Sequence, residues 1–95
     1  VIIYDISGTE VFRLTGNPNS KFGVALSMSN SLLAIGASGE NKVYLYDYTT
    51  GSLKCTVSNN IVGTGFGEYV ALQENNSRLL VGDDNLKKTS VFDIP

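Results

Sequence analysis

The sequence predicts an all-β protein built from repeated antiparallel sheets of four strands. The first observation is repetition: Phe22-Gly23 recurs as Phe66-Gly67 after 44 residues, and Tyr46-Asp47 recurs as Phe92-Asp93 after 46 residues. The second is that short apolar runs alternate with breaks rich in Ser, Asn, Thr and Gly about every ten residues, which is too frequent for ordinary helices. The period is close to that of one four-stranded blade of a β-propeller.

The repeat divides the chain into three parts, of which only the middle part is a full unit. Residues 1–16 are expected to form the last two strands of one blade, because Ile3-Tyr4-Asp5 aligns with Leu45-Tyr46-Asp47. Residues 17–62 are expected to form a complete blade, and residues 63–95 the first three strands of the next. About two blades cannot close a ring. We therefore expect a fragment of one larger propeller domain, with closure by identical copies as the alternative.

The strands of a unit differ in how apolar they are. The second strand is apolar throughout, as Leu32–Ala37 and again as Leu79–Gly82, and continuous apolar runs indicate burial on both faces. The fourth strand, within residues 52–57, alternates between apolar and polar residues, which is typical of a half-solvated outer strand. Stacked blades explain both patterns, because central strands lie between neighbouring sheets.

Glycines recur at two positions of the repeat and are interpreted as packing residues. Gly23 and Gly67 follow Phe22 and Phe66, the aromatic residues that open the first strand, where backbones converge and a side chain would collide. The remaining repeated glycines end the second strand: Gly36 and Gly82.

Three tyrosines of the third strand share one face. Tyr44, Tyr46 and Tyr48 have a spacing of two, which leaves Val43 and Leu45 on the opposite face. Such a row could stack on sugar rings, but both faces of inner strands are normally covered. Packing between sheets is therefore the favoured interpretation.

The composition is that of a globular chain and narrows the classes of partner. The 95 residues are 42% hydrophobic and 17% charged, with a net charge of −2. The seven Lys and Arg are scattered and form no basic stripe, so nucleic acid is not an expected partner. No apolar run approaches the roughly 20 residues of a membrane span. Cys55 is the single cysteine, so no intrachain disulfide can form.

The sequence contains few of the residue types and motifs that enzymes use for catalysis. The sequence contains no histidine, which excludes Ser-His-Asp triads, Cys-His pairs and histidine-based zinc sites within it. Asp5, Asp47 and Asp93 recur at one repeat position, which favours hydrogen bonding within hairpins over a catalytic role. Gly63–Gly67 superficially matches a dinucleotide loop, but residues 68–72 read as a strand instead of the required helix. We expect no enzyme, no catalytic residue and no cofactor.

Several repeated phrases resemble a known family. Residues 22–27 read FGVALS, residues 33–38 read LAIGAS, and residues 43–47 read VYLYD. This order resembles the Phe-Gly, Gly-Ala-Pro and Val-Tyr-Val-Tyr elements of the FG-GAP repeat, the blade unit of the integrin α-subunit propeller. The resemblance spans nearly the whole chain. Ser38 stands where the family often has proline, and Asp83-Asp84 replaces the Ala-Pro pair in the second copy.

Some FG-GAP blades hold calcium between their first two strands, and this chain lacks that loop. The corresponding turns, Met28–Ser31 and Glu74–Ser77, offer at most one carboxylate. The acidic cluster Asp83-Asp84-Asn85 lies after the second strand, outside the family's metal position. Because Ca²⁺ takes six to eight oxygen ligands, we interpret this cluster as a solvated loop and expect no metal site.

The resemblance implies a non-catalytic propeller repeat module for extracellular protein–protein or cell-surface recognition and adhesion. Its expected partner is a protein, or further blades of the same or a neighbouring chain, and the implied location is extracellular or at the cell surface. One alternative is a structural subunit of a filament or surface coat assembled through β-edge pairing. Another is the propeller accessory region of a larger secreted hydrolase.

Function in such a scaffold resides in the loops of one rim. The candidate binding loops follow the second strand of successive units, and both are polar. A separate candidate is Asn75 of the Asn75-Asn76-Ser77 sequon, a glycosylation acceptor or simply part of a polar turn. The candidate loop residues are Ser38, Gly39, Glu40, Asn41, Asp83, Asp84, Asn85, Lys87 and Lys88.

Overall fold

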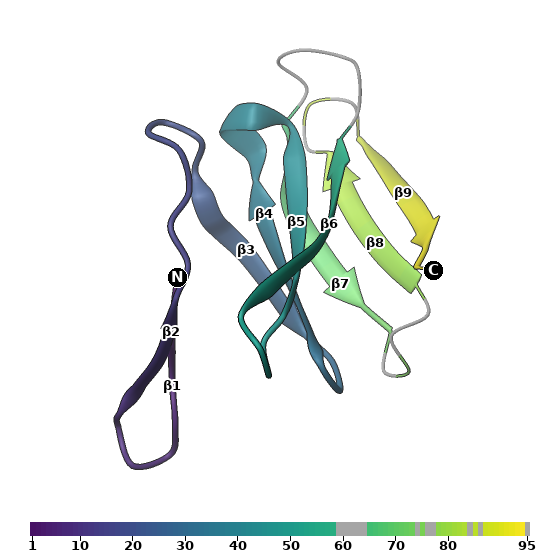
Figure 1. Ribbon diagram of the computed structural model, residues 1–95. Coiled ribbons are helices and arrows are strands. Elements are labelled where there is room, and N and C mark those ends of the chain that lie inside the picture. The colour runs from purple at the N-terminus through teal and green to yellow at the C-terminus, as the bar shows by residue number, and fades with distance from the viewer. Residues whose placement is uncertain (59–64, 74, 76–77, 84, 86, 95) are drawn as a thin grey trace.

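The computed structural model describes residues 1–58, 65–73, 75, 78–83, 85 and 87–94. In this part of the chain nine strands form three antiparallel sheets of two, four and three strands (Figure 1). Each sheet has its strands in chain order, because every connection within a sheet is a hairpin. The predicted all-β class and the four-stranded antiparallel unit are confirmed.

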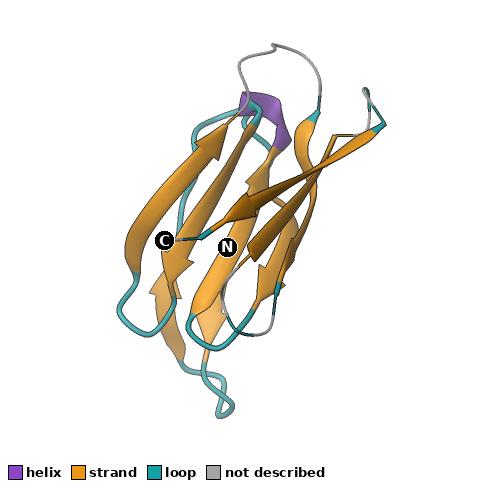
Figure 2. Ribbon diagram, turned by 90° about the vertical axis from the view of Figure 1, so that its right-hand side faces the viewer, coloured by secondary structure: helices purple, strands orange, loops and turns teal. Residues whose placement is uncertain are grey.

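The three sheets follow one another along the chain. A short 3₁₀ turn, η1, lies between β4 and β5 (Figure 2). The elements are β1 (Ile2–Tyr4) and β2 (Glu10–Arg13) in the first sheet, β3 (Phe22–Met28), β4 (Leu32–Ala37), η1 (Ser38–Glu40), β5 (Lys42–Asp47) and β6 (Ser52–Ser58) in the second, and β7 (Phe66–Leu72), β8 (Arg78–Asp83) and β9 (Lys88–Asp93) in the third.

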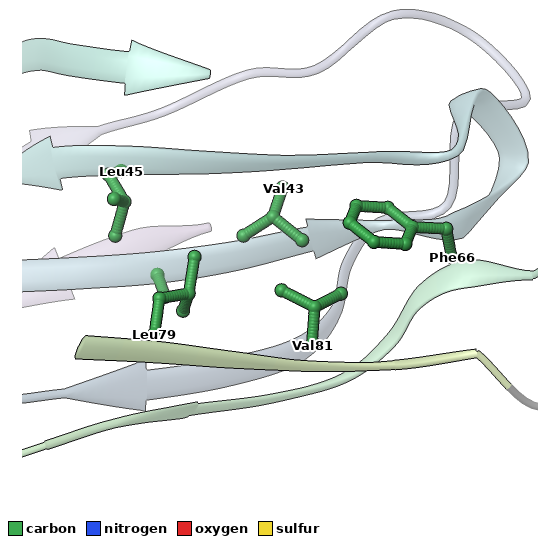
Figure 3. Close-up of a cluster of buried hydrophobic side chains, with 6 residues drawn as sticks. Val43, Leu45, Phe66, Leu79 and Val81 are labelled. Atoms are coloured by element: carbon green, nitrogen blue, oxygen red, sulfur yellow. The ribbon is translucent and has the colours of Figure 1, made fainter. Parts of the chain in front are cut away.

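The main core lies between the second and third sheets. Strand β7 packs against β3 and β4 of the preceding sheet. Figure 3 shows Val43 and Leu45 of β5 pointing toward Leu79 and Val81 of β8, with Phe66 of β7 beside them. None of these five side chains is more than 2% exposed. The apolar face of each sheet is thus removed from water by its neighbour, which is the principal stabilising contribution.

A second core lies on the opposite face of the four-stranded sheet. Leu33 and Ile35 of β4 are buried there together with Leu14, which precedes β3 in the chain. Strand β4 is therefore buried on both faces, as the continuous apolar run predicts. Tyr44 and Tyr46 of β5 pack against this cluster together with Tyr48, which follows the strand, and this confirms the interpretation of the three tyrosines as packing residues.

Strand β8 differs from its repeat counterpart. Leu79 and Val81 are buried, but Leu80 between them is 38% exposed. The prediction that this second strand is buried on both faces was therefore wrong. The physical reason is that only one face of the third sheet lies against another sheet in the described part of the chain.

The Phe-Gly pairs form the same irregularity in both units. Phe22 lies opposite Ala37 at a shift of register in β3, and Phe66 lies opposite Asp83 at the equivalent shift in β7. The following glycines have φ of +94° at Gly23 and +97° at Gly67, a region that residues with a Cβ avoid. The recurrence of this bulge explains why glycine follows the aromatic residue in each copy.

Two glycines stand where the backbones of the second and third sheets approach each other closely. A Cβ at Gly36 would lie 2.0 Å from the carbonyl oxygen of Gly67, and a Cβ at Gly67 would lie 2.6 Å from that of Lys42. The predicted packing role is confirmed at both positions. Gly82 differs, because its nearest neighbour is the Tyr69 side chain of its own sheet.

The repeated aspartates organise hairpin turns. Asp5 Oδ1 accepts hydrogen bonds from the backbone N–H groups of Ser7 and Thr9, at 3.0 and 2.9 Å, and from the Ser7 hydroxyl at 2.7 Å. Asp47 Oδ1 accepts from the N–H of Thr49 at 2.9 Å and from its hydroxyl at 2.5 Å. The predicted hairpin role is confirmed for these two residues.

The third aspartate of the series has a different partner. Asp93 ends β9 and forms an ion pair with Arg78 at the start of β8, with Nε and Oδ1 3.3 Å apart. Both side chains are well exposed, so this pair contributes little to stability.

These turns predict a pH dependence of stability. Hydrogen bonds from the Ser7 side chain at Asp5, and from the Thr49 side chain at Asp47, hold the pKa of each carboxyl below its ordinary value of 3.8. A lowered pKa means that the stabilisation is complete above the unfolded value and is lost as pH falls through the folded one. Asp47→Asn keeps an acceptor oxygen but does not titrate. We therefore expect the variant to lose less of its free energy of unfolding than wild type does below about pH 4, the range in which an aspartate titrates.

Urea unfolding of both proteins between neutral and acidic pH measures this effect. The free energies of unfolding should converge as the pH falls, because wild-type Asp47 becomes protonated while the asparagine does not change. Parallel curves over the whole range would contradict the prediction.

Candidate functional site

The two predicted binding loops lie at the same end of the stacked sheets. The first is η1 with Asn41, between β4 and β5, and the second connects β8 to β9 (Figure 1). We call this end the rim, defined by residues 38–41 and the described residues of 83–88. Asp84, which also belonged to the predicted site, lies outside the described residues.

The first rim loop is held in place by a segment that sequence reasoning did not include. The Gly39 N–H donates to the carbonyl oxygen of Ser20 at 2.8 Å. A Cβ at Gly39 would lie 2.3 Å from the carbonyl oxygen of Asn19, so this close approach requires glycine. Asn41 closes the turn in the left-handed conformation, with its N–H donating to Ser38 O at 3.2 Å.

Glu40 is the organised charge of this loop. Its Oε2 accepts a hydrogen bond from Asn17 Nδ2 at 2.8 Å, and its Oε1 accepts one from the Tyr44 hydroxyl at 3.0 Å. The bond from Asn17 is the main reason that the pKa of Glu40 lies below its usual range. Burial, and then the hydrogen bond that its hydroxyl donates to Glu40, raise the pKa of Tyr44. Glu40 is therefore an oriented carboxylate that stays ionised at neutral pH.

Sequence reasoning missed both partners of Glu40. Asn17 is 23 residues away and carries no recognisable motif. Tyr44 was assigned only to the packed tyrosine face, although its hydroxyl reaches the rim while its ring packs in the core. No sequence signal points to the pair of Glu40 and Tyr44, because a spacing of four residues brings side chains together on a helix and not from a turn into a strand.

Two predicted rim residues do not offer their side chains to a partner. Ser38 is 8% exposed and Asp83 is 6% exposed, so both are buried within the loops. The Ser38 hydroxyl and the Asn41 side-chain carbonyl are buried without a hydrogen-bond partner in the structure. Leaving such atoms unsatisfied costs on the order of 1–3 kcal/mol each.

The accessible surface of the rim carries opposite charges on neighbouring sheets. Gly39 is exposed and Glu40 half-buried after β4, whereas Asn85, Lys87 and Lys88 are exposed after β8. Lys87 has a φ of +55°, an unusual conformation for a residue with a side chain. The accessible charges described on the rim are thus the Glu40 carboxylate in the first loop and the ammonium groups of Lys87 and Lys88 in the second, whose sequence also contains Asp83 and Asp84.

The remaining predicted residues lie away from the rim or within the sheets. Phe22 is half-buried and meets Tyr44 edge-on at a centroid distance of 5.4 Å, whereas the buried Phe66 meets Phe92 at 6.0 Å. Asn75 is exposed in the connection between β7 and β8, at the end opposite the rim (Figure 1). The other two residues of its sequon lie outside the described residues.

The described residues contain no cluster of three or more His, Cys, Asp or Glu side chains placed to hold a metal ion. Within the same residues, no helix is long and apolar enough to cross a bilayer.

Comparison with protein families and with curated proteins finds no match to this chain. The resemblance to FG-GAP repeats therefore stays a prediction from the quoted phrases.

Proposed function

We propose that this chain is a non-catalytic β-propeller repeat module that recognises a protein partner through its rim. The observation that carries the proposal is the placement of Glu40 and the pair Lys87 and Lys88 at one end of two stacked repeat sheets. Loops positioned by a rigid scaffold are where binding residues concentrate. An extracellular or cell-surface role in adhesion is the form of this proposal that the FG-GAP resemblance supports.

The stacking of the sheets supports the propeller part of the proposal. In a propeller each four-stranded sheet packs face to face with its neighbours, and its strands are joined in chain order. The second sheet of this chain has packed side chains on both faces. The glycine bulge recurs at the same place in two sheets, as expected when successive blades meet their neighbours in the same way.

The charges of the rim favour a partner with mixed charge. Glu40 is oriented by Asn17 and Tyr44, so its carboxylate loses little freedom on binding. Lys87 and Lys88 are exposed, so we expect their charges to raise mainly the rate at which the partner associates. Binding should therefore weaken as the salt concentration rises.

The proposal is tested with an array of purified extracellular domains, probed with the wild-type chain and with Lys87→Glu/Lys88→Glu. We expect at least one domain to bind the wild type, and the double variant to bind it about tenfold more weakly, since a close like-charge pair costs on the order of 1–2 kcal/mol. Lys54→Glu, an exposed change on β6 away from the rim, is the matched control. Equal loss with the control, or binding indifferent to the rim, would contradict the proposal.

A structural role is a second candidate, and one observation favours it. Strand β9 is the last strand of its sheet, and its outer edge pairs with no strand in the described part of the chain. An open edge can pair with a strand of another molecule. Assembly through β-edge pairing would then build a filament or coat.

A further inference from the structure

The outer face of the third sheet is apolar and exposed. Tyr69 is 62% exposed, Leu80 38% and Val91 57%, and they lie on three adjacent strands. Two shallow grooves run along this face, one lined by Ala71, Leu80 and Val91 together with Gln73 and Arg78, and the other by Tyr69 and Leu80 among others. We call this surface the β7–β9 face.

The β7–β9 face is the repeat counterpart of a surface that is buried in the second sheet. Leu80 lies opposite Val91 in register, as Ala34 lies opposite Leu45 one repeat earlier. Ala34 is 0% exposed and Leu45 1% exposed, because the third sheet packs on them. The sequence thus repeats a surface whose first copy is covered by a neighbouring sheet.

The matching surface is also present and open on the same molecule. Val70 and Leu72 of β7 are half-buried and pack against the core between the second and third sheets. Their counterparts in β3 are Leu26 and Met28, because these pair with β4 as Val70 and Leu72 pair with β8. Leu26 is 51% exposed and Met28 59% exposed. We call this surface the β3 flank.

The β1–β2 hairpin leaves the β3 flank accessible. Ile3, together with Leu14, which follows β2, packs against the part of the second sheet formed by Leu33 and Ile35. The hairpin otherwise extends away from the second sheet (Figure 1). Within the chain, β7 contacts β3 and β4 more than β5, so a first strand carries most of the contact between stacked sheets.

We propose that a second copy of this chain docks head to tail, with its β3 flank against the β7–β9 face of the first. The two surfaces are the repeat counterparts of the two sides of the interface between the second and third sheets, so docking would repeat that interface between molecules. The two surfaces differ, so the contact is heterologous, and it can propagate into a ring or an open chain of copies. This inference goes beyond the proposed recognition function, because it uses sheet faces and leaves the rim free.

One detail of the existing interface sharpens the proposal. The Leu72 N–H donates a hydrogen bond to Ser27 Oγ of the neighbouring sheet at 2.9 Å. In the docked pair, Met28 takes the place of Leu72 and Ala71 takes the place of Ser27, so the hydroxyl is missing. Ala71→Ser would supply it. A hydrogen bond of about 1 kcal/mol predicts about fivefold tighter association.

Sedimentation equilibrium of the whole chain over a range of concentrations tests the proposal. We expect species at multiples of 10.2 kDa, and we expect Leu80→Arg to weaken association at least tenfold because it places a charge in the apolar contact. Leu53→Arg is the matched control, since Leu53 is 50% exposed on β6, outside both surfaces. A chain that stays monomeric, or association that survives Leu80→Arg, would overturn the proposal.

Mixing two variants tests the head-to-tail geometry. Leu80→Arg keeps an intact β3 flank, and Leu26→Arg keeps an intact β7–β9 face. Each should be monomeric alone, yet an equimolar mixture should form a dimer through the two intact surfaces. Circular dichroism confirms that both variants are folded. A mixture that stays monomeric while wild-type chains associate would overturn the head-to-tail arrangement.

Discussion

Phe66→Ala is expected to lower the free energy of unfolding by about 3–5 kcal/mol, the range for removing a large aromatic side chain from a core. Phe66 is 2% exposed and lies between the second and third sheets, with its ring edge-on to Phe92. Its removal leaves a cavity where the two sheets meet, so the stacking itself is weakened. Urea denaturation followed by circular dichroism measures the change.

Phe22→Ala is the matched control, because Phe22 holds the same place in the preceding unit. It is only half-buried, so its removal should cost clearly less. If Phe66→Ala does not fold, Phe66→Leu should fold with a loss of about 1 kcal/mol, typical of a swap that conserves much of the volume. Equal losses for the two alanine variants would show that the sheets do not bury these residues differently.

Gly36→Ala is the second change with a large expected effect, about 3 kcal/mol, at the upper end of the usual cost of overpacking. The added methyl would lie 2.0 Å from the carbonyl oxygen of Gly67 in the next sheet. A backbone atom cannot turn away as a side chain can, so the two sheets must separate. Thermal unfolding should show a lower midpoint than wild type.

Gly82→Ala provides the comparison at the same repeat position. Its Cβ would lie 3.0 Å from the Tyr69 Cβ and 3.1 Å from the Tyr69 Cδ2, so the neighbouring strand has to give only slightly and no second sheet is pushed away. We expect a loss well below that of Gly36→Ala. A loss of the same size at both positions would mean that inter-sheet contact is not what requires glycine at residue 36.

The candidate site was only partly predictable from the sequence. The repeat predicts that each candidate loop follows the second strand of its unit, and in the structure both loops lie at the same end of the sheets. The burial of Ser38 and Asp83 could not be predicted from the sequence, because polar side chains in a turn are usually solvated. The partners of Glu40 were also missed, since Asn17 reaches it only through the folded path of residues 17–21.

Local pattern was sufficient for the strands and for the turn chemistry. Apolar periodicity and polar breaks depend on neighbouring residues, so the sequence alone determined an all-β chain with a four-stranded antiparallel unit. The same holds for Asp5 and Asp47, whose hydrogen-bond partners lie within four residues.

The tertiary structure decided which of two similar strands is covered. Leu33-Ala34 and Leu79-Leu80 are alike in sequence, yet Ala34 is fully buried and Leu80 is 38% exposed. The difference arises because burial depends on whether another sheet lies against that face, which the strand's own residues do not encode. The sequence by itself therefore determined the repeated unit. Which of its faces stay open, the β7–β9 face and the β3 flank, was decided only by the packing of the sheets.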